Sequence, residues 1–226
     1  MTQDQQKLAA ATYAVRLVTD GMLVGLGSGS TAALMIQALA ERVRDGLRIT
    51  GVPTSRPSAA LAKDLGIPLT ELDGRRLDLT IDGADEVDPE RNLIKGGGGA
   101  LLDEKLVALA SERYVIIVDS GKLVDRLGQR NAVPIETVRF GWQTTRDRLA
   151  AGGFECRLRG GDHPFVSSDG NYILDCFSWG ERRLADPDVG VSIKSMSGVI
   201  EHGLFIGFNP EIVVGKANGV VDSLKD

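Results

Sequence analysis

The chain has 226 residues, of which 42% are hydrophobic and 25% charged, values close to the globular average that exclude a disordered chain. No apolar run approaches the roughly 20 residues of a membrane-spanning helix. The net charge of −5 and the lack of a basic tract argue against nucleic acid as the main partner. This length suits one large core, or a larger domain with a smaller one, and we favour the second arrangement.

The first 130 residues alternate between helical and strand-like segments. Helices are expected through residues 13–18 and over 30–43, where apolar side chains share one helix face. Short apolar runs predict strands at 22–26, 48–52, 77–81 and 114–118. Because helices separate these runs, the pattern indicates an α/β fold with a mostly parallel sheet covered on both faces.

The pattern changes in the later part of the chain. Helices are expected at 142–151 and 186–195, with strands near 154–159, 172–177 and 202–207, and Gly-rich turns between them. A last apolar run at 211–215 is expected to return to the first domain. We therefore predict one domain from residues 1–130 plus 206–226, and a smaller α+β domain from 131–205.

A glycine-rich loop, Gly27-Ser28-Gly29-Ser30-Thr31, follows the first strand and opens a helix. Backbone N–H groups and the helix dipole favour an anion there, and phosphate is the natural guest. The alternative is a tight turn with Ser30 as an ordinary N-cap. The loop is neither a dinucleotide fingerprint, because Ser30 replaces the third glycine, nor a P-loop.

A cluster of acids, Asp82-Gly-Ala-Asp85-Glu86-Val-Asp88, follows the predicted strand at 77–81. Open α/β sheets bind ligands at the carboxyl ends of their strands, so Asp82 and Asp85 could hold Mg²⁺, bind sugar hydroxyls or move protons. The alternative is a polar turn that closes the strand, and we prefer that interpretation for Glu86 and Asp88.

Lys95 precedes four consecutive glycines, and Glu104 follows them in a helix expected to begin near residue 100. Glycine tolerates unusual backbone angles and close approach to a ligand. Glu104 is either a favourable charge at a helix N-terminus or a general base, with Lys95 stabilising developing negative charge. Lys122 follows the strand at 114–118 and either reaches the same sheet edge or is a loop lysine, whereas Lys105 is expected to be solvated.

The remaining reactive residue types lack catalytic or metal-binding spacing. Cys156 and Cys176 are expected to be reduced thiols on strands, and His163 and His202 to be structural or surface residues. The polar N-terminus lacks the features of a secretory signal, which favours the cytoplasm.

Taken together, the loop at 27–31, the acids at 82–86 and the segment at 95–105 resemble ribose-5-phosphate isomerase, type A. The segments 2–7, 119–128, 169–175 and 198–205 extend this resemblance over nearly the whole chain. The resemblance implies a Rossmann-like domain that carries the site, a smaller α+β domain, and a homodimer or homotetramer.

The resemblance further implies reversible conversion of ribose 5-phosphate to ribulose 5-phosphate in the non-oxidative pentose phosphate pathway, without a metal or organic cofactor. Glu104 would shuttle a proton through an enediolate, Lys95 would steady the oxyanion, and Asp82 and Asp85 would bind hydroxyls and assist ring opening. The remaining implied substrate-binding residues are Lys7, Ser28, Gly29, Ser30, Thr31, Gly83, Ala84, Gly96, Gly97, Gly98 and Lys122.

Two other classes of protein fit parts of this pattern. A sugar-phosphate sensor without catalysis would lack the base at Glu104, and the 20 residues before Gly21 are too short for a helix-turn-helix segment. An NAD-dependent oxidoreductase is disfavoured by Ser30 in the fingerprint, and by the lack of an acid after the second strand.

Overall fold

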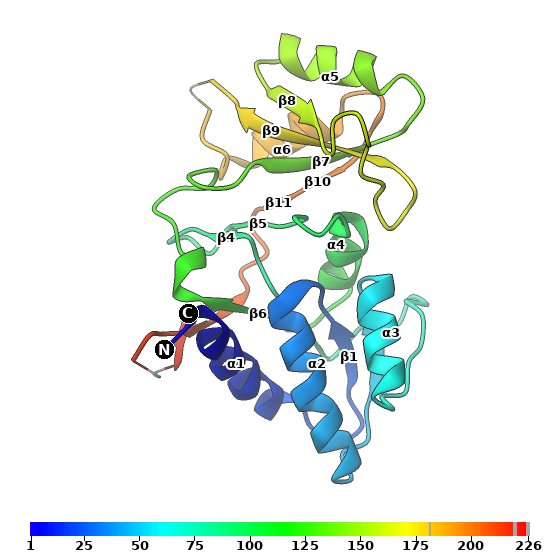
Figure 1. Cartoon of the computed structure of the whole chain (residues 1–226), viewed down its shortest axis with the longest axis vertical. Coiled ribbons are helices and arrows are strands. Elements are labelled where there is room, and N and C mark those ends of the chain that lie inside the picture. The colour runs from blue at the N-terminus through cyan, green and yellow to red at the C-terminus, as the bar shows by residue number, and fades with distance from the viewer. Residues whose placement is uncertain (181, 219–220, 225–226) are drawn as a thin grey trace. The chain divides into compact units, whose positions relative to one another are not determined.

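The computed structural model describes residues 1–180, 182–218 and 221–224 (Figure 1). The chain divides into two compact units. The first comprises Met1–Ala84, Asp103–Leu123 and Asn209–Asp226, and the second comprises Asp85–Leu102 and Val124–Phe208. Within the described ranges, no helix has the length and apolar character needed to cross a membrane.

The first unit contains a six-stranded sheet in the order β13-β12-β6-β3-β1-β2. Its strands are β1 (Leu23–Leu26), β2 (Thr50–Pro53), β3 (Leu79–Asp82), β6 (Tyr114–Asp119), β12 (Glu211–Gly215) and β13 (Val221–Leu224). All neighbouring pairs are parallel except β12 with β13. The α/β fold with a mostly parallel sheet is therefore confirmed.

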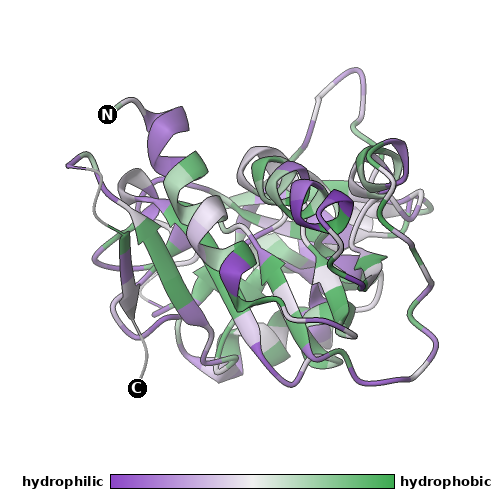
Figure 2. Cartoon of the chain, turned by 90° about the horizontal axis from the view of Figure 1, so that it is seen from below, coloured by the Kyte–Doolittle hydropathy of each residue, from purple (hydrophilic) through white to green (hydrophobic). Residues whose placement is uncertain are grey.

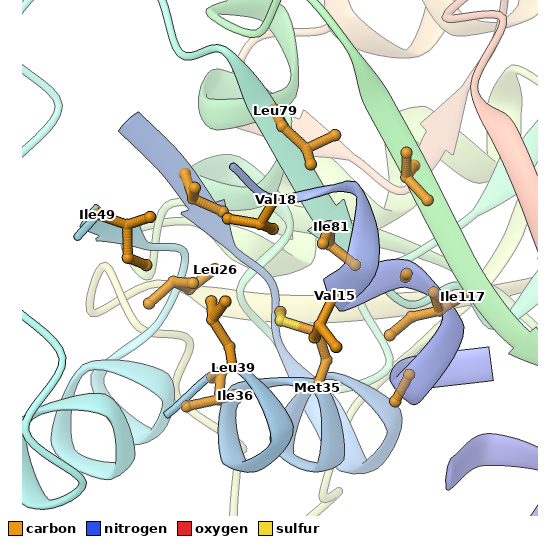
Figure 3. Close-up of a cluster of buried hydrophobic side chains, with 14 of the residues drawn as sticks. Val15, Val18, Leu26, Met35, Ile36, Leu39, Ile49, Leu79, Ile81 and Ile117 are labelled. Carbon is orange, nitrogen blue, oxygen red and sulfur yellow. The ribbon is translucent and has the colours of Figure 1, made fainter. Parts of the chain in front are cut away.

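Helices cover both faces of this sheet. They are α1 (Gln3–Ala14), α2 (Gly29–Arg44), α3 (Arg56–Asp64) and α4 (Leu101–Leu109), with short 3₁₀ helices η1 (Val15–Leu17) and η2 (Ser120–Lys122). Figure 3 shows Met35 and Leu39 of α2 beside Leu26 of β1, in a buried cluster that also draws on α1 and α3. On the opposite face, Val107 of α4 packs with Val52 and Leu77.

The N-terminal helix begins earlier than the sequence pattern indicated. Thr2 and Gln5 form a reciprocal capping box that starts α1 at Gln3, and the chain tightens into η1 at Val15. The first turn of α1 is hydrophilic in Figure 2, so apolar periodicity did not mark it. The cap, rather than a hydrophobic stripe, sets this boundary.

The second unit contains two antiparallel sheets. The larger has the order β10-β7-β9-β8, formed by β7 (Val133–Thr137), β8 (Glu155–Leu158), β9 (Tyr172–Ser178) and β10 (Val199–His202). The smaller has the order β11-β5-β4, formed by β4 (Glu86–Val87), β5 (Leu93–Ile94) and β11 (Leu204–Phe205). Two helices, α5 (Trp142–Ala151) and α6 (Pro187–Lys194), contribute Leu149 and Ile193 to the core of this unit.

The second unit includes residues that the sequence pattern assigned to the first domain, namely 85–102 and 124–130, and also 206–208. The reason is long-range pairing, because β5 pairs with β11, which lies about a hundred residues later in the chain. In addition, the Val124 amide donates to the Val87 carbonyl at 3.0 Å. Such pairings leave no local signal in the sequence.

Several strands of the second unit were not as expected. β7 was missed because Pro134 lies within it, and proline normally argues against a central strand. The strand expected at 202–207 is instead the pair β10 and β11, separated at Gly203. A side chain at Gly203 would collide with the Lys95 carbonyl. The Gly203 amide donates to the Pro134 carbonyl at 2.7 Å.

The prediction that both cysteines are reduced is wrong for this structure. Cys156 and Cys176 lie on strands as expected, but they face each other across β8 and β9 and form a disulfide. Direct cross-strand partners bring their side chains together. Spacing along the sequence could not reveal this pairing, because it depends on the register of the two strands.

Glu86 and Asp88 are structural, as preferred from the sequence, but they lie in different settings. Asp88 closes a turn by accepting from the Asn92 amide at 2.8 Å. Glu86 instead is fully buried in β4, where its carboxylate accepts from the amides of Gly128, Arg130 and Asn131, each at 2.6 Å. These three amides fix the segment 128–131 onto β4.

We predict that Glu86→Gln destabilises the protein by about 1–3 kcal/mol, because the new NH₂ group cannot accept from the amides that face the carboxylate. The free energy of unfolding in urea measures this. The exposed Glu155 of β8 provides a control, since Glu155→Gln should change that free energy by less than about 0.5 kcal/mol. Equal effects of the two variants would contradict the assigned role of Glu86.

Candidate functional site

The first glycine loop connects β1 to α2 and is shaped by Asp82. A side chain at Gly27 would overlap the Asp82 carboxylate and Cα, so this position needs glycine. Ser28, rather than Ser30, is the N-cap of α2, and its hydroxyl lies 2.8 Å from the Thr54 hydroxyl instead of capping the helix. The simple N-cap interpretation of Ser30 is therefore wrong.

The N-terminus of α2 has the features of an anion site. Gly29, Ser30 and Thr31 form the first turn, where backbone N–H groups have no partner within the helix. The Lys7 ammonium of α1 reaches this turn and donates to the Ser30 hydroxyl at 3.2 Å. A cation, a hydroxyl and a helix N-terminus thus meet at one point, which suits phosphate.

Asp82 lies at the point where the strand order reverses. β1 has β2 on one side and β3 on the other, and ligands of open α/β sheets bind at such a switch point. The buried Asp82 carboxylate ends β3, and its Oδ1 atom accepts from the amides of Ser28 at 2.9 Å and Gly83 at 2.7 Å. It therefore joins the ends of two neighbouring strands. Ala84 follows as a half-buried residue.

Glu104 and Lys122 belong to the same unit. Glu104 lies in the first turn of α4 and is 6% exposed, so its carboxylate is largely removed from water. Lys122 is half-buried in η2, directly after β6, which neighbours β3 in the sheet. Lys105 is buried, so its expected solvation is wrong.

In the second unit, Asp85 is joined to the run of four glycines. The Gly97 amide donates to Asp85 Oδ2 at 2.8 Å. The glycines form a tight turn in which the Gly99 amide donates to the Gly96 carbonyl at 3.0 Å, with φ of 97° at Gly96 and 75° at Gly99. The turn requires these left-handed angles, which glycine adopts readily. Gly97 and Gly98 are exposed at its tip.

Lys95 is the residue before this turn and is only 2% exposed. Its backbone amide donates to the Gly203 carbonyl at 2.9 Å, and its ammonium lies 5.7 Å from the centre of the Phe205 ring. A buried ammonium is costly unless negative charge or polar groups face it. This position is suited to an electrostatic role.

Two residues near these groups escaped the sequence analysis. Thr54 is buried and links the Ser28 hydroxyl to the Leu26 carbonyl. Arg159 donates to the carbonyls of Gly96 and Gly97. Neither lies in a local motif, and Arg159 is more than sixty residues from the glycines it contacts.

The two histidines have the expected character. His163 is exposed, while His202 is buried and its Nδ1 atom accepts from the Leu204 amide at 3.3 Å. Among the described residues, no group of three or more His, Cys, Asp and Glu side chains is arranged to hold a metal ion.

Comparisons of sequence and of structure with known proteins both match this chain to one enzyme family. The family of ribose 5-phosphate isomerase A (phosphoriboisomerase A) matches residues 50–219. Ribose-5-phosphate isomerase A of Cereibacter sphaeroides strain ATCC 17029 is 49% identical, covering 99% of this chain and 87% of the relative.

Solved structures agree. Ribose 5-phosphate isomerase A of Methanocaldococcus jannaschii superposes with a TM-score of 0.93 at 37% identity, over 100% of both chains. A D-ribose-5-phosphate isomerase in complex with phospho-erythronic acid gives a TM-score of 0.94 at 37% identity, also over 100% of both chains. With near-complete coverage in both comparisons, the chain belongs to the ribose 5-phosphate isomerase A family.

Proposed function

We propose that this protein interconverts ribose 5-phosphate and ribulose 5-phosphate, as an aldose-ketose isomerase of the non-oxidative pentose phosphate pathway. The observation that carries the proposal is family membership over nearly the full chain, at 49% identity to a relative named for this activity. The chemistry of the candidate residues supports it, because the reaction needs an anion site, a base and an electrostatic partner.

The substrate phosphate is proposed to bind at the N-terminus of α2. The backbone of residues 28–31, the Ser30 and Thr31 hydroxyls and the Lys7 ammonium are the donors. The 3.2 Å contact between Lys7 and Ser30 supports this assignment, because it places a cation at the first turn of the helix, where the backbone amides point outward. A relative bound to phospho-erythronic acid, itself a phosphorylated sugar acid, is consistent with such a site.

Glu104 is proposed as the base. Its carboxylate takes the proton from C2 of the open-chain aldose, the electrons of that C–H bond form the C1–C2 double bond, and O1 gains negative charge. The same carboxyl group returns the proton to C1 as the C2 carbonyl forms, and the proton released from O2 passes to O1, which becomes the C1 hydroxyl of the ketose. The position of Glu104 supports this role, because a carboxylate buried in the first turn of a helix is held in a fixed place, as a general base must be.

Lys95 is proposed to stabilise the enediolate oxygen, and Asp82 and Asp85 to bind hydroxyls and assist ring opening. Ring opening removes a proton from the anomeric hydroxyl and delivers one to the ring oxygen, so groups that exchange protons are required. The deep burial of the Lys95 ammonium supports its role, because a fixed charge away from water stabilises an oxyanion strongly. Gly83, Ala84, the glycines 96–98 and Lys122 are proposed as further substrate contacts.

We further propose a cytoplasmic homodimer or homotetramer that needs neither metal nor organic cofactor. The family resemblance supports the assembly and the lack of a cofactor. In the cytoplasm, thiol reductants would keep Cys156 and Cys176 reduced, so the disulfide is expected only under oxidising conditions.

We predict that Glu104→Gln lowers turnover of ribose 5-phosphate, measured with EDTA present, by about a hundredfold or more, because the amide cannot accept the C2 proton. Asp103→Asn, which removes a charge from the same helical turn, serves as the control and should retain most of the activity. If the wild-type protein binds ribose 5-phosphate without converting it, the isomerase proposal fails and a sensor takes its place.

A second prediction concerns the phosphate. Lys7→Ala should raise the inhibition constant of inorganic phosphate by about 10- to 100-fold, because one charged donor is lost. Competition against ribose 5-phosphate turnover provides the measurement. The exposed Lys63 of α3 is the control. If Lys63→Ala raises the inhibition constant of phosphate as much as Lys7→Ala does, the effect comes from the net charge of the protein and not from a contact between Lys7 and phosphate.

A further inference from the structure

We infer that Arg159 is a positioning residue that holds the glycine turn at 96–99 and, through one peptide group of that turn, orients the carboxylate of Asp85. The inference rests on the proposed function in one respect, since it assumes that Asp85 contacts the substrate. All the residues that carry it belong to the second unit.

Arg159 follows β8 and is fixed on one side by Asp175 of β9. Its Nε atom donates to Asp175 Oδ2 at 2.9 Å, and its Nη2 atom donates to Oδ1 at 2.5 Å. The two side chains are only 17% and 19% exposed. This two-point pairing sets the plane of the guanidinium group, which a single contact would not do.

The other edge of the same guanidinium meets the glycine turn. Its Nη1 atom donates to the Gly96 carbonyl at 3.1 Å and to the Gly97 carbonyl at 3.0 Å. The Phe165 ring lies 5.5 Å from the guanidinium carbon and occupies the space that a side chain at Gly99 would need. The Ser168 amide donates to the Gly99 carbonyl at 3.2 Å. The segment 159–168 therefore holds the turn at three points.

The peptide group between Gly96 and Gly97 connects Arg159 to Asp85. Arg159 binds its carbonyl oxygen, and its N–H group donates to Asp85 Oδ2 at 2.8 Å. A cation on the oxygen polarises the peptide and strengthens the N–H donor. One rigid, planar group is thus held between a guanidinium and a carboxylate, which fixes the direction of the Asp85 side chain.

The geometry also explains why arginine is needed. Lysine has one nitrogen, which could reach either Asp175 or the two carbonyls, whereas the guanidinium reaches both from separate nitrogens. Arg157, two residues earlier, makes a useful comparison, because its guanidinium lies over the exposed Phe177 ring, 5.5 Å from the ring centre. Arg157 carries the same charge but lies within β8, and its contact among the described residues is with Phe177.

The first test compares Arg159→Lys with Arg157→Lys in the full chain. We expect kcat/KM for ribose 5-phosphate to fall about 10- to 100-fold in Arg159→Lys and by less than about twofold in Arg157→Lys, with both melting temperatures close to that of the wild type. In Arg159→Ala, millimolar guanidinium should restore part of kcat. A wild-type value of kcat/KM in Arg159→Lys would overturn the inference. So would an Arg159→Ala variant that guanidinium does not rescue and that loses kcat in proportion to its fall in melting temperature.

A second measurement does not depend on catalysis. Hydrogen exchange of the Gly97 amide, followed by NMR, should be about tenfold faster in Arg159→Ala than in the wild type and unchanged in Arg157→Ala. Unchanged exchange in Arg159→Ala would refute the positioning role. Absence of wild-type turnover would instead refute the proposed function and leave this measurement to decide the role of Arg159.

Discussion

The hydrogen bonds that Asp82 accepts from the amides of Ser28 and Gly83 are the constraint on which the first unit depends. They join the ends of β1 and β3 where the strand order reverses, and they explain the glycine at position 27. Because the carboxylate is buried, its two backbone donors offset the cost of removing charge from water. The start of α2, and with it the proposed phosphate site, is held in place by the same group.

Glycine has a different use in each of the two loops. Gly27 makes room for a carboxylate that organises the backbone, whereas the glycines at 96 and 99 allow a turn with left-handed angles. The first loop is fixed mainly by its own neighbours in the sheet. The second needs support from distant side chains, because a run of glycines has the greatest conformational freedom to lose. Arg159 and Phe165 supply that support.

Much of the first unit could be predicted from sequence because its strands are short, apolar and separated by helices, and because most of its candidate site residues follow strand ends. The second unit was harder. β7 was obscured by Pro134, the disulfide depends on strand register, and Arg159 reaches the glycines only after β8 and β9 have paired. Local sequence patterns identified the side chains with proposed chemical roles. They did not identify the side chains that hold these in place, because such contacts join residues that are far apart in the sequence.

The division of the chain has a consequence for its biosynthesis. The chain passes between the units four times, after residues 84, 102, 123 and 208. β12 lies between β6 and β13 in the finished sheet, yet it begins only at Glu211. While the ribosome is still making the second unit, β6 therefore presents an unpaired edge, the kind of surface on which nascent chains associate wrongly. The first unit can close its sheet only after the whole second unit has been made, because β12 follows that unit in the chain.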